Sequence, residues 1–196
     1  HGELVLFSNN TIEFWANTGA TDFTYSRIAS ANVEWGLAAP WSLCKFNDSL
    51  AFLARNTLGE VIVATLQNHT VTPISTYDLS FIINGYASVT DAASFSYLLG
   101  QHPMYQINFP SQSESWLYDA STNLWSQLQS NAITRHRAEM FSNFLNTKKV
   151  GDFANGNIYT LDTANYTDNG SPVTFQLVGK HIFKEHKRVS VSRVEI

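Results

Sequence analysis

Apolar and polar residues alternate along most of the chain, and the 3.6-residue period of a surface helix is scarce. Four segments begin a recurring unit, in which an apolar strand is followed by a polar turn and a second strand. The first strands are predicted at Leu4–Phe7, Leu50–Leu53, Phe95–Leu98 and Val150–Phe153. The second strands are predicted at Thr11–Trp15, Glu60–Val63, Met104–Ile107 and Asn157–Leu161. The pattern predicts an all-β protein of antiparallel strands.

The connections between these strands carry residues that tight hairpin turns require. The predicted turns are Asn9–Asn10, Leu58–Gly59, Gln101–Pro103 and Asn155–Gly156. A third strand completes the unit, most clearly at Trp116–Tyr118 and Val173–Leu177. Two segments depart from the alternation. We interpret Asp78–Ala87 as a short helix or an irregular crossover, and Arg135–Asn146 as a helical turn region.

The recurring unit has a period of roughly 40–50 residues, which is the spacing of β-propeller blades of three to four strands. We therefore expect one β-propeller domain over residues 1–196, with repeats at approximately 1–46, 47–91, 92–146 and 147–196. A β-sandwich with regular turns is the alternative fold. Residues 188–196 alternate like a strand that has no partner after it, and the first residue is His. We thus expect an incomplete propeller, a fragment of a longer protein.

The composition indicates a surface that is poor in charge. Charged residues make up 14% of the chain, well below the quarter or so of an ordinary soluble domain. The net charge of −4 gives no electrostatic footprint for nucleic acid, and the basic cluster Lys184–Arg188 reads as a solvated edge. No apolar run approaches the ~18 residues of a membrane span. We expect neither sequence-specific nucleic-acid contact nor a membrane partner.

No motif has the spacing of a metal site. Cys44 stands alone among apolar neighbours, which predicts a buried small side chain rather than a nucleophile. Five residues superficially resemble a calcium loop, but they lack its twelve-residue spacing and a turn explains them: Asp162, Asn165, Asp168, Asn169 and Gly170. The histidines that lack ligand spacing are His69, His102, His136, His181 and His186. We predict no metal and no other cofactor.

Candidate catalytic residues are equally unconvincing. The carboxylates that could pair as in a glycosidase are Asp91, Glu114, Asp119, Asp152 and Asp162. Asp119, however, begins a turn in which its side chain can accept backbone amides. No Gly-x-Ser-x-Gly elbow and no Gly-rich phosphate loop is present. Five tryptophans could form a sugar platform, yet most fall at core-facing positions: Trp15, Trp35, Trp41, Trp116 and Trp125. The sequence predicts no catalytic residues.

Residues 101–125 form the most distinctive stretch of the chain. Its motif residues are His102, Tyr105, Phe109, Pro110, Trp116, Tyr118, Asp119, Thr122 and Trp125. A second group follows with Gly151, Asp152, Tyr159, Asp162, Asp168 and Gly170. In their order and spacing these residues resemble the packaged-DNA stabilization proteins, or tail accessory factors, of short-tailed bacteriophages and prophages. The chain departs from the pattern of that family at Gln101, Pro73 and Ser126–Leu128.

The resemblance implies a β-propeller that assembles as a ring in the phage tail, beneath the portal, and holds the packaged genome in the capsid. It implies a non-enzymatic virion component with no cofactor, whose partners are other tail and portal or adaptor proteins. A kelch-like propeller module that binds carbohydrate or protein is the alternative function. A glycoside hydrolase is a third, weaker hypothesis.

Overall fold

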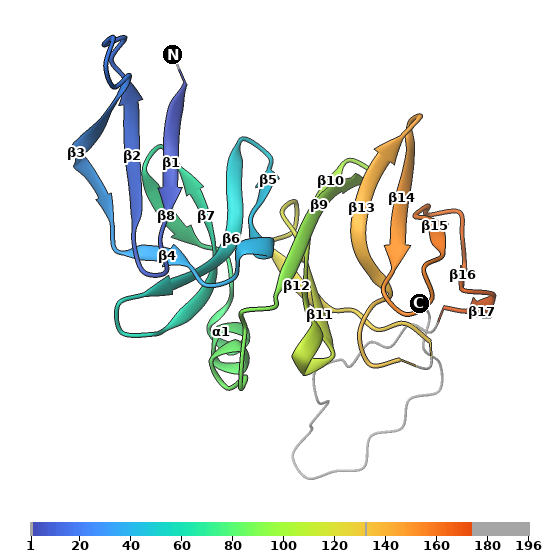
Figure 1. Ribbon diagram of the computed structural model, residues 1–196. Helices are drawn as coiled ribbons and strands as arrows, with labels where there is room; N and C mark the ends of the chain where they lie inside the picture. The colour runs from blue at the N-terminus through green and yellow to red at the C-terminus, as the bar shows by residue number, and fades with distance from the viewer. Residues whose placement is uncertain (1, 132, 174–196) are drawn as a thin grey trace.

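The computed structural model describes residues 2–131 and 133–173, and within them four antiparallel sheets follow one another in chain order (Figure 1). The first sheet contains β1 (Glu3–Phe7), β2 (Ile12–Asn17) and β3 (Tyr25–Val33). The second contains β4 (Trp35–Leu37), β5 (Cys44–Phe46), β6 (Ser49–Asn56), β7 (Val61–Gln67) and β8 (Thr70–Pro73). The all-β prediction is confirmed.

The third sheet contains β9 (Ala93–Leu99), β10 (His102–Phe109), β11 (Glu114–Asp119) and β12 (Leu124–Gln127). The fourth contains β13 (Ala138–Phe144), β14 (Thr147–Asp152) and β15 (Ile158–Thr160). A small hairpin follows, formed by β16 (Thr167–Asp168) and β17 (Ser171–Pro172). Two 3-10 turns, η1 (Pro40–Ser42) and η2 (Pro110–Gln112), complete the connections. The strands predicted at Val173–Leu177 and 188–196 lie largely or wholly outside the described residues.

The boundaries between the sheets differ from the repeat boundaries expected from the sequence. The predicted boundary at 46–47 falls inside the β5–β6 hairpin, and the boundary at 146–147 falls inside the β13–β14 hairpin. The segments taken as first strands are β1, β6, β9 and β14, whereas the sheets begin at β1, β4, β9 and β13. The alternation pattern does not predict the short strands β4 and β5 or the strand β13, so the expected boundaries are displaced.

The turn between β9 and β10 is also shifted from its predicted place. Gly100 and Gln101 make the turn, both with positive φ (54° and 73°), while Pro103 pairs with Leu98 inside the sheet. Such φ values are those of a tight hairpin of primed type. The turn at Asn155–Gly156 is as predicted, with Gly156 at φ 71°.

The predicted short helix is present as α1 (Tyr77–Asn84), between the second and third sheets. Thr76 caps it by accepting a hydrogen bond from the amide of Leu79, and Asp78 complements the helix dipole in the first turn. The side-chain amide of Asn84 bonds both the N–H and the C=O of Val61, which docks α1 on β7. The second predicted helical region, residues 135–146, is wrong. Most of it is strand β13, because pairing with β14 overrides local preference.

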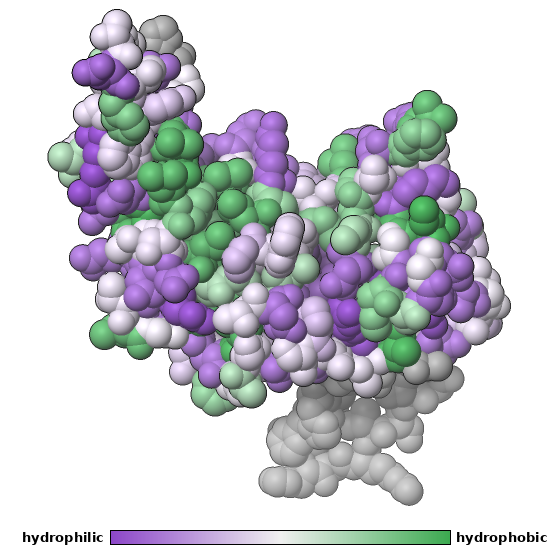
Figure 2. All heavy atoms as spheres, in the orientation of Figure 1, coloured by the Kyte–Doolittle hydropathy of each residue, from purple (hydrophilic) through white to green (hydrophobic). Residues whose placement is uncertain are grey.

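The first and second sheets pack through an apolar core. Ile12 and Phe14 of β2 are buried there against Phe52 and Ala54 of β6. Burial of a side chain of this size stabilises the fold by roughly 1.5–3 kcal/mol relative to exposure. Figure 2 shows that apolar atoms continue onto the surface at the junction of these two sheets.

A glycine lets the backbones of the first two sheets approach closely. A Cβ added to Gly36 of β4 would lie 2.2 Å from the backbone nitrogen of Asn10, in the β1–β2 turn. Beside it, the amide of Leu37 donates to the carbonyl of Ser8 over 2.8 Å. No side chain fits between the turn and the strand, so glycine is required at position 36.

The second and third sheets share the largest apolar core. Ala51 and Leu53 of β6 face it, opposite Tyr105, Ile107 and Phe109 of β10. Successive strand residues point to opposite faces. Phe52 and Ala54, which alternate with Ala51 and Leu53 in β6, therefore face the first sheet. The second sheet is therefore covered on both faces, and α1 closes one end of this core through its own buried residues.

The third and fourth sheets meet through a smaller core and a polar seam. Phe95 of β9 packs against Ala138 and Val150 of the fourth sheet. The other face of β10 contributes Gln106 and Asn108, which are both buried. The four sheets thus stack in series rather than as the two facing layers of a β-sandwich. Within the described residues, no helix is long and apolar enough to cross a membrane.

Candidate functional site

The motif residues of the third sheet gather at its contact with the second sheet. Tyr118 and Trp125 lie side by side on β11 and β12, with ring centroids 5.1 Å apart. Tyr105 of β10 meets Trp125 edge-on at 6.4 Å, and Phe46 of β5 meets Tyr105 at 5.9 Å. Such aromatic pairs contribute about 0.5–1.5 kcal/mol beyond the area that they bury. These motif residues are therefore packing residues.

Two hydrogen bonds fix this aromatic cluster to the neighbouring sheet. The indole N–H of Trp125 donates to the carbonyl of Ile74 over 2.8 Å, just before α1. The phenol of Tyr105 donates to the carbonyl of Ser42 over 3.2 Å, and Ser94 donates to the same carbonyl over 2.6 Å. Burial raises the pKa of Tyr105, so the phenol stays protonated and remains a donor.

His102 and Asp119 are brought together at one end of the third sheet. The distance from Nδ1 of His102 to Oδ2 of Asp119 is 2.8 Å. Partial desolvation acts to raise the pKa of Asp119. Hydrogen bonds from His102, the amide of Ser121 and the side chain of Thr122 outweigh it, so the pKa is lowered. The motif residues His102, Asp119 and Thr122 therefore fix the β11–β12 turn, and Asp119 has the structural role predicted for it.

Trp116 belongs to a second cluster, near the end of α1. Its indole N–H lies 3.2 Å from Oε2 of Glu114 and 3.3 Å from the phenol oxygen of Tyr86. Tyr86 donates a short hydrogen bond to the same carboxylate. Desolvation, followed by the bond to Glu114, raises the pKa of Tyr86. Glu114 is thus an acceptor that joins the segment after α1 to β11.

Phe109 and Pro110 end β10 and begin the 3-10 turn η2. Phe109 is fully buried, with the ring of Tyr86 at 5.0 Å. Immediately beyond, the carboxylate of Asp91 accepts hydrogen bonds from both the amide and the hydroxyl of Ser111. Asp91 is therefore occupied as the cap of this turn.

The polar seam between the third and fourth sheets was not predicted from the sequence. The amide of Asn108 donates to the carbonyl of Ala138 over 2.8 Å. Nδ1 of His136 lies 3.2 Å from Nε2 of Gln106 and 3.3 Å from the amide of Ala138, so this ring nitrogen accepts. Burial, with Arg137 nearby, lowers the pKa of His136, although Asp168 opposes the shift. The neutral imidazole is the form that fits.

An ion-pair network continues the seam into the fourth sheet. The guanidinium of Arg137 lies 3.2 Å from Oδ2 of Asp152 and 3.5 Å from Oδ1 of Asp168. Burial acts to raise the pKa of Asp152, but the amide of Ala154 and Arg137 outweigh it and lower the pKa. The motif residues Asp152 and Asp168 thus share one cation and hold three segments together.

The remaining motif residues serve hairpins of the fourth sheet and beyond. Tyr159 of β15 packs in the core with Val150, and its phenol donates to Asn169 over 3.0 Å. Asn169 and Gly170 form the β16–β17 turn with φ values of 48° and 84°. The carboxylate of Asp162 accepts the amide of Ala164. Asp162 therefore serves one turn, Asn169 serves the β16–β17 turn, and Asp168 pairs with Arg137. No group of three potential metal ligands occurs within the described residues.

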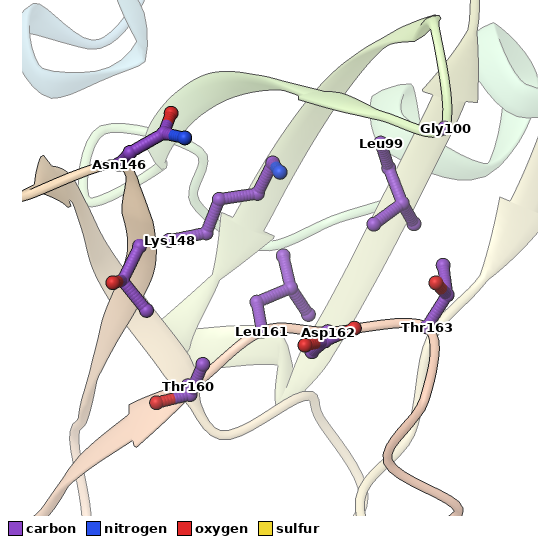
Figure 3. A pocket seen from close by; sticks show the side chains of 9 residues that line it. Leu99, Gly100, Asn146, Lys148, Thr160, Leu161, Asp162 and Thr163 are labelled. Carbon is purple, nitrogen blue, oxygen red and sulfur yellow. The ribbon is translucent and has the colours of Figure 1, made fainter.

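A small pocket lies between the β9–β10 turn and the fourth sheet (Figure 3). Leu99 and Gly100 line one side, and Lys148, Leu161 and Asp162 line the other. Its volume is about 140 Å³, well under the roughly 300 Å³ at which ligand pockets begin. Its size suits water or an ion rather than an organic substrate.

The five tryptophans do not make a common platform. Trp116 and Trp125 are half-buried and hydrogen-bonded as described, and Trp15 bonds Glu13 in the first sheet. Trp35 packs at the edge of the first core, while Trp41 is 77% exposed in η1. The candidate carboxylates are likewise dispersed over separate turns and networks. Cys44 is half-buried, and desolvation raises its thiol pKa.

Antiparallel sheets of three to five strands that pack on one another in chain order resemble the blades of a propeller. A family model described as bacteriophage P22 Gp10, beta-propeller, matches residues 1–166. The chain belongs to this P22 Gp10 family. Membership confirms both the resemblance seen in the sequence and the β-propeller fold.

A curated member of the P22 Gp10 family shows the extent of the match. The tail hub protein gp10 of Salmonella phage P22 is 29% identical over 125 residues. The matched segment covers 61% of this chain and 26% of that protein, so the chain spans about a quarter of the relative. Within this chain, the motif residues make contacts between sheets and within turns.

Proposed function

We propose that the chain is a non-enzymatic structural component of a phage tail, which helps to close the portal channel and to stabilise packaged DNA. The family match over residues 1–166 carries this proposal, together with the similarity to the tail hub protein of phage P22. The proposed location is the virion. The proposed partners are other tail and portal or adaptor proteins, in a homo-oligomeric ring.

The use of the polar side chains supports a structural role. Asp91, Glu114, Asp119 and Asp152 each accept hydrogen bonds that hold a turn or join two sheets. Such hydrogen-bonded networks rigidify a scaffold, whereas a catalytic acid or base must reach a substrate proton. The mildly acidic chain would also not grip DNA that has to leave later, since DNA affinity rests on basic side chains.

A phage with a stop codon in this gene tests the proposal. In a host that does not suppress the codon, we expect capsids that package DNA and then lose it to added nuclease. Supplying the protein in trans should restore retention, and the protein should co-purify with portal rings in electron micrographs. Stable, DNA-filled particles that lack the protein would contradict the proposal. Specific binding on a glycan array would favour the kelch-like alternative instead.

A further inference from the structure

A second recess lies at the junction of the third and fourth sheets. The third sheet contributes the turn η2, and the fourth contributes the segment that leads into β13 and the residue that follows β14. Its lining residues are Pro110, Ser113, Ile133, Thr134, Arg135 and Phe153. Its volume is about 420 Å³, within the range of roughly 300–1,000 Å³ that ligand pockets occupy. The recess is large enough for a small organic molecule or for a side chain of another protein.

Arg135 is the only charged residue of this lining, and it is 7% exposed. Its guanidinium carbon lies 3.5 Å from the centroid of the Phe153 ring, a cation–π contact. Nη1 donates to Oε2 of Glu139 over 2.6 Å. Nε and Nη2 make no hydrogen bond to any described residue. Buried donors are normally bonded, so this edge of the guanidinium lacks an acceptor, and the accessible remainder of the side chain opens into the recess.

The walls of the recess are fixed in place by hydrogen bonds. The amide of His136 donates to the buried hydroxyl of Ser115 in β11 over 3.1 Å, which ties the segment before β13 to the third sheet. The amide of Phe153 donates to the carbonyl of Arg137 over 3.2 Å. On the rim, Ser113 has a φ of 53°, a left-handed conformation that is costly for a residue other than glycine and persists only where the surroundings impose it. The recess is therefore formed in advance of any ligand.

The chemistry of the lining favours a carboxylate. The two oxygens of a carboxylate match the parallel N–H groups on one edge of a guanidinium. Glu139 already shares the charge of Arg135, so a single additional negative charge suits the recess better than the double charge of a phosphate. The side chain of Glu139 retains 26% exposure, and solvent therefore screens its repulsion of a second carboxylate. Pro110 and Ile133 provide apolar contacts beside the guanidinium.

We propose that this recess is a binding site for a carboxylate carried on an apolar body, held by Nε and Nη2 of Arg135. A free organic acid and an acidic side chain of a partner protein share this chemistry. The apolar body lies against Pro110 and Ile133, and the hydroxyls of Ser113 and Thr134 lie at the rim. The proposal rests on the geometry of the recess and requires no role in DNA retention.

A titration of the 196-residue chain followed by NMR tests the site. The probes are 3-phenylpropanoate and its neutral amide, 3-phenylpropanamide. We expect the acid to bind at least about 10-fold more tightly than the amide, because a charged acceptor strengthens the bonds to the guanidinium. The shifted resonances should be those of residues 110–113, 133–135 and 153. A blocked dipeptide of phenylalanine and glutamate, compared with its glutamine counterpart, distinguishes the two sources. Binding of this dipeptide at least as tightly as the free acid assigns the site to a partner's side chain, and weaker binding assigns it to an organic acid.

Thr134→Glu tests the site without altering Arg135. The exposed rim position places a competing carboxylate beside the guanidinium, so we expect about 10-fold weaker binding of 3-phenylpropanoate and an unchanged Tm. Thr163→Glu makes the same charge change at an exposed position beside the other pocket and should leave the affinity unchanged. Arg135→Lys keeps the charge but loses the paired donors, and should also weaken binding about 10-fold.

Three results would overturn the proposal. The first is equal affinity for the acid and the amide, or no saturable binding of the acid up to about 20 mM. The second is an affinity of Thr134→Glu that equals that of the parent chain. The third is tighter binding of phenyl phosphate than of 3-phenylpropanoate, since the site would then select a phosphate.

Discussion

The indole nitrogen of Trp125 lies 2.8 Å from the carbonyl oxygen of Ile74, so the last strand of the third sheet is bonded to the segment that leads from the second sheet into α1. The two residues are 51 positions apart in the chain. The same indole ring packs on Tyr118 and meets Tyr105 edge-on. A single side chain thus combines aromatic packing with a directed bond across the interface.

Replacing Trp125 with Phe removes the bond and keeps an aromatic ring. We expect a loss of about 1–2 kcal/mol in the free energy of unfolding, since the carbonyl of Ile74 loses its donor and part of the packing volume goes. The shift in urea midpoint measures it. Trp41→Phe, at the 77% exposed position in η1, is the matched control and should change stability by less than about 0.5 kcal/mol. Equal shifts for the two variants would show that the Ile74 bond contributes nothing.

Gly36→Ala should separate the first sheet from the second. The added methyl group would lie 2.2 Å from a backbone nitrogen that no rotamer change can move. We expect destabilisation by about 3 kcal/mol, the upper end of overpacking costs. In the Gly36→Ala variant, hydrogen exchange should be faster for the backbone amides of β1 and β2 than for those of β10. Gly151→Ala in the same chain is the control and should be nearly neutral; unchanged protection of β1 in Gly36→Ala would contradict the geometry.

Arg137→Met should leave the buried carboxylate of Asp152 without its cation. The side chain of Asp152 is fully buried, so we expect a loss of about 3 kcal/mol in unfolding free energy at pH 7. The exposed pair of Arg27 and Glu13 offers a matched control, and Arg27→Met should cost less than about 0.5 kcal/mol. If both arginine variants have the same denaturation midpoint, the network around Asp152 is not the stabilising element described here.

Lowering the pH should destabilise the polar seam between the third and fourth sheets, because His136 becomes protonated. Its folded pKa is lowered, so the unfolded chain binds more protons, and stability falls as pH drops below about 6.5 toward the folded pKa. The slope reaches at most about 1.4 kcal/mol per pH unit in that window. Protonated Nδ1 would face two N–H donors, from Gln106 and Ala138.

His136→Asn isolates this contribution, because the amide oxygen can accept the same two donors without titrating. Unfolding titrations between pH 5 and 8 should give a shallower dependence for the variant than for the parent chain. The carboxyl groups with lowered pKa, Asp119 and Asp152, lose their stabilising effect in a separate window below their usual pKa. Superimposable pH profiles from the two proteins would exclude His136 as the titrating group.

Three strands of the third sheet, β9, β10 and β11, could be predicted from alternation alone, because they are long and bounded by turn residues, whereas the short edge strand β12 was not predicted. The three-residue strands β4 and β5 could not, since their pairing with β6 comes from tertiary contacts rather than from a local pattern. For the same reason residues 135–146 look helical in isolation. Their Ala, Glu and Met residues suit a helix, but the partner strand β14 decides the conformation.

The structural role of Asp119 followed from its place at a turn, and the structure confirms it. The polar seam had no comparable signal. Gln106 and Asn108 alternate with apolar residues as solvent-facing side chains do, yet they are buried against a carbonyl 30 residues further along the chain. A hydrogen bond to a distant backbone atom leaves no trace in residue type or spacing, so it becomes visible only once the sheets are stacked.

Serial stacking has a consequence for how the protein is made. Each sheet contacts the sheet that precedes it in the sequence, so a nascent chain has its docking partner already outside the ribosome when a new sheet emerges. Folding can then advance in the direction of synthesis, one sheet at a time. Each newly added sheet would leave a single unpartnered apolar face for the chaperones to shield until the next one arrives.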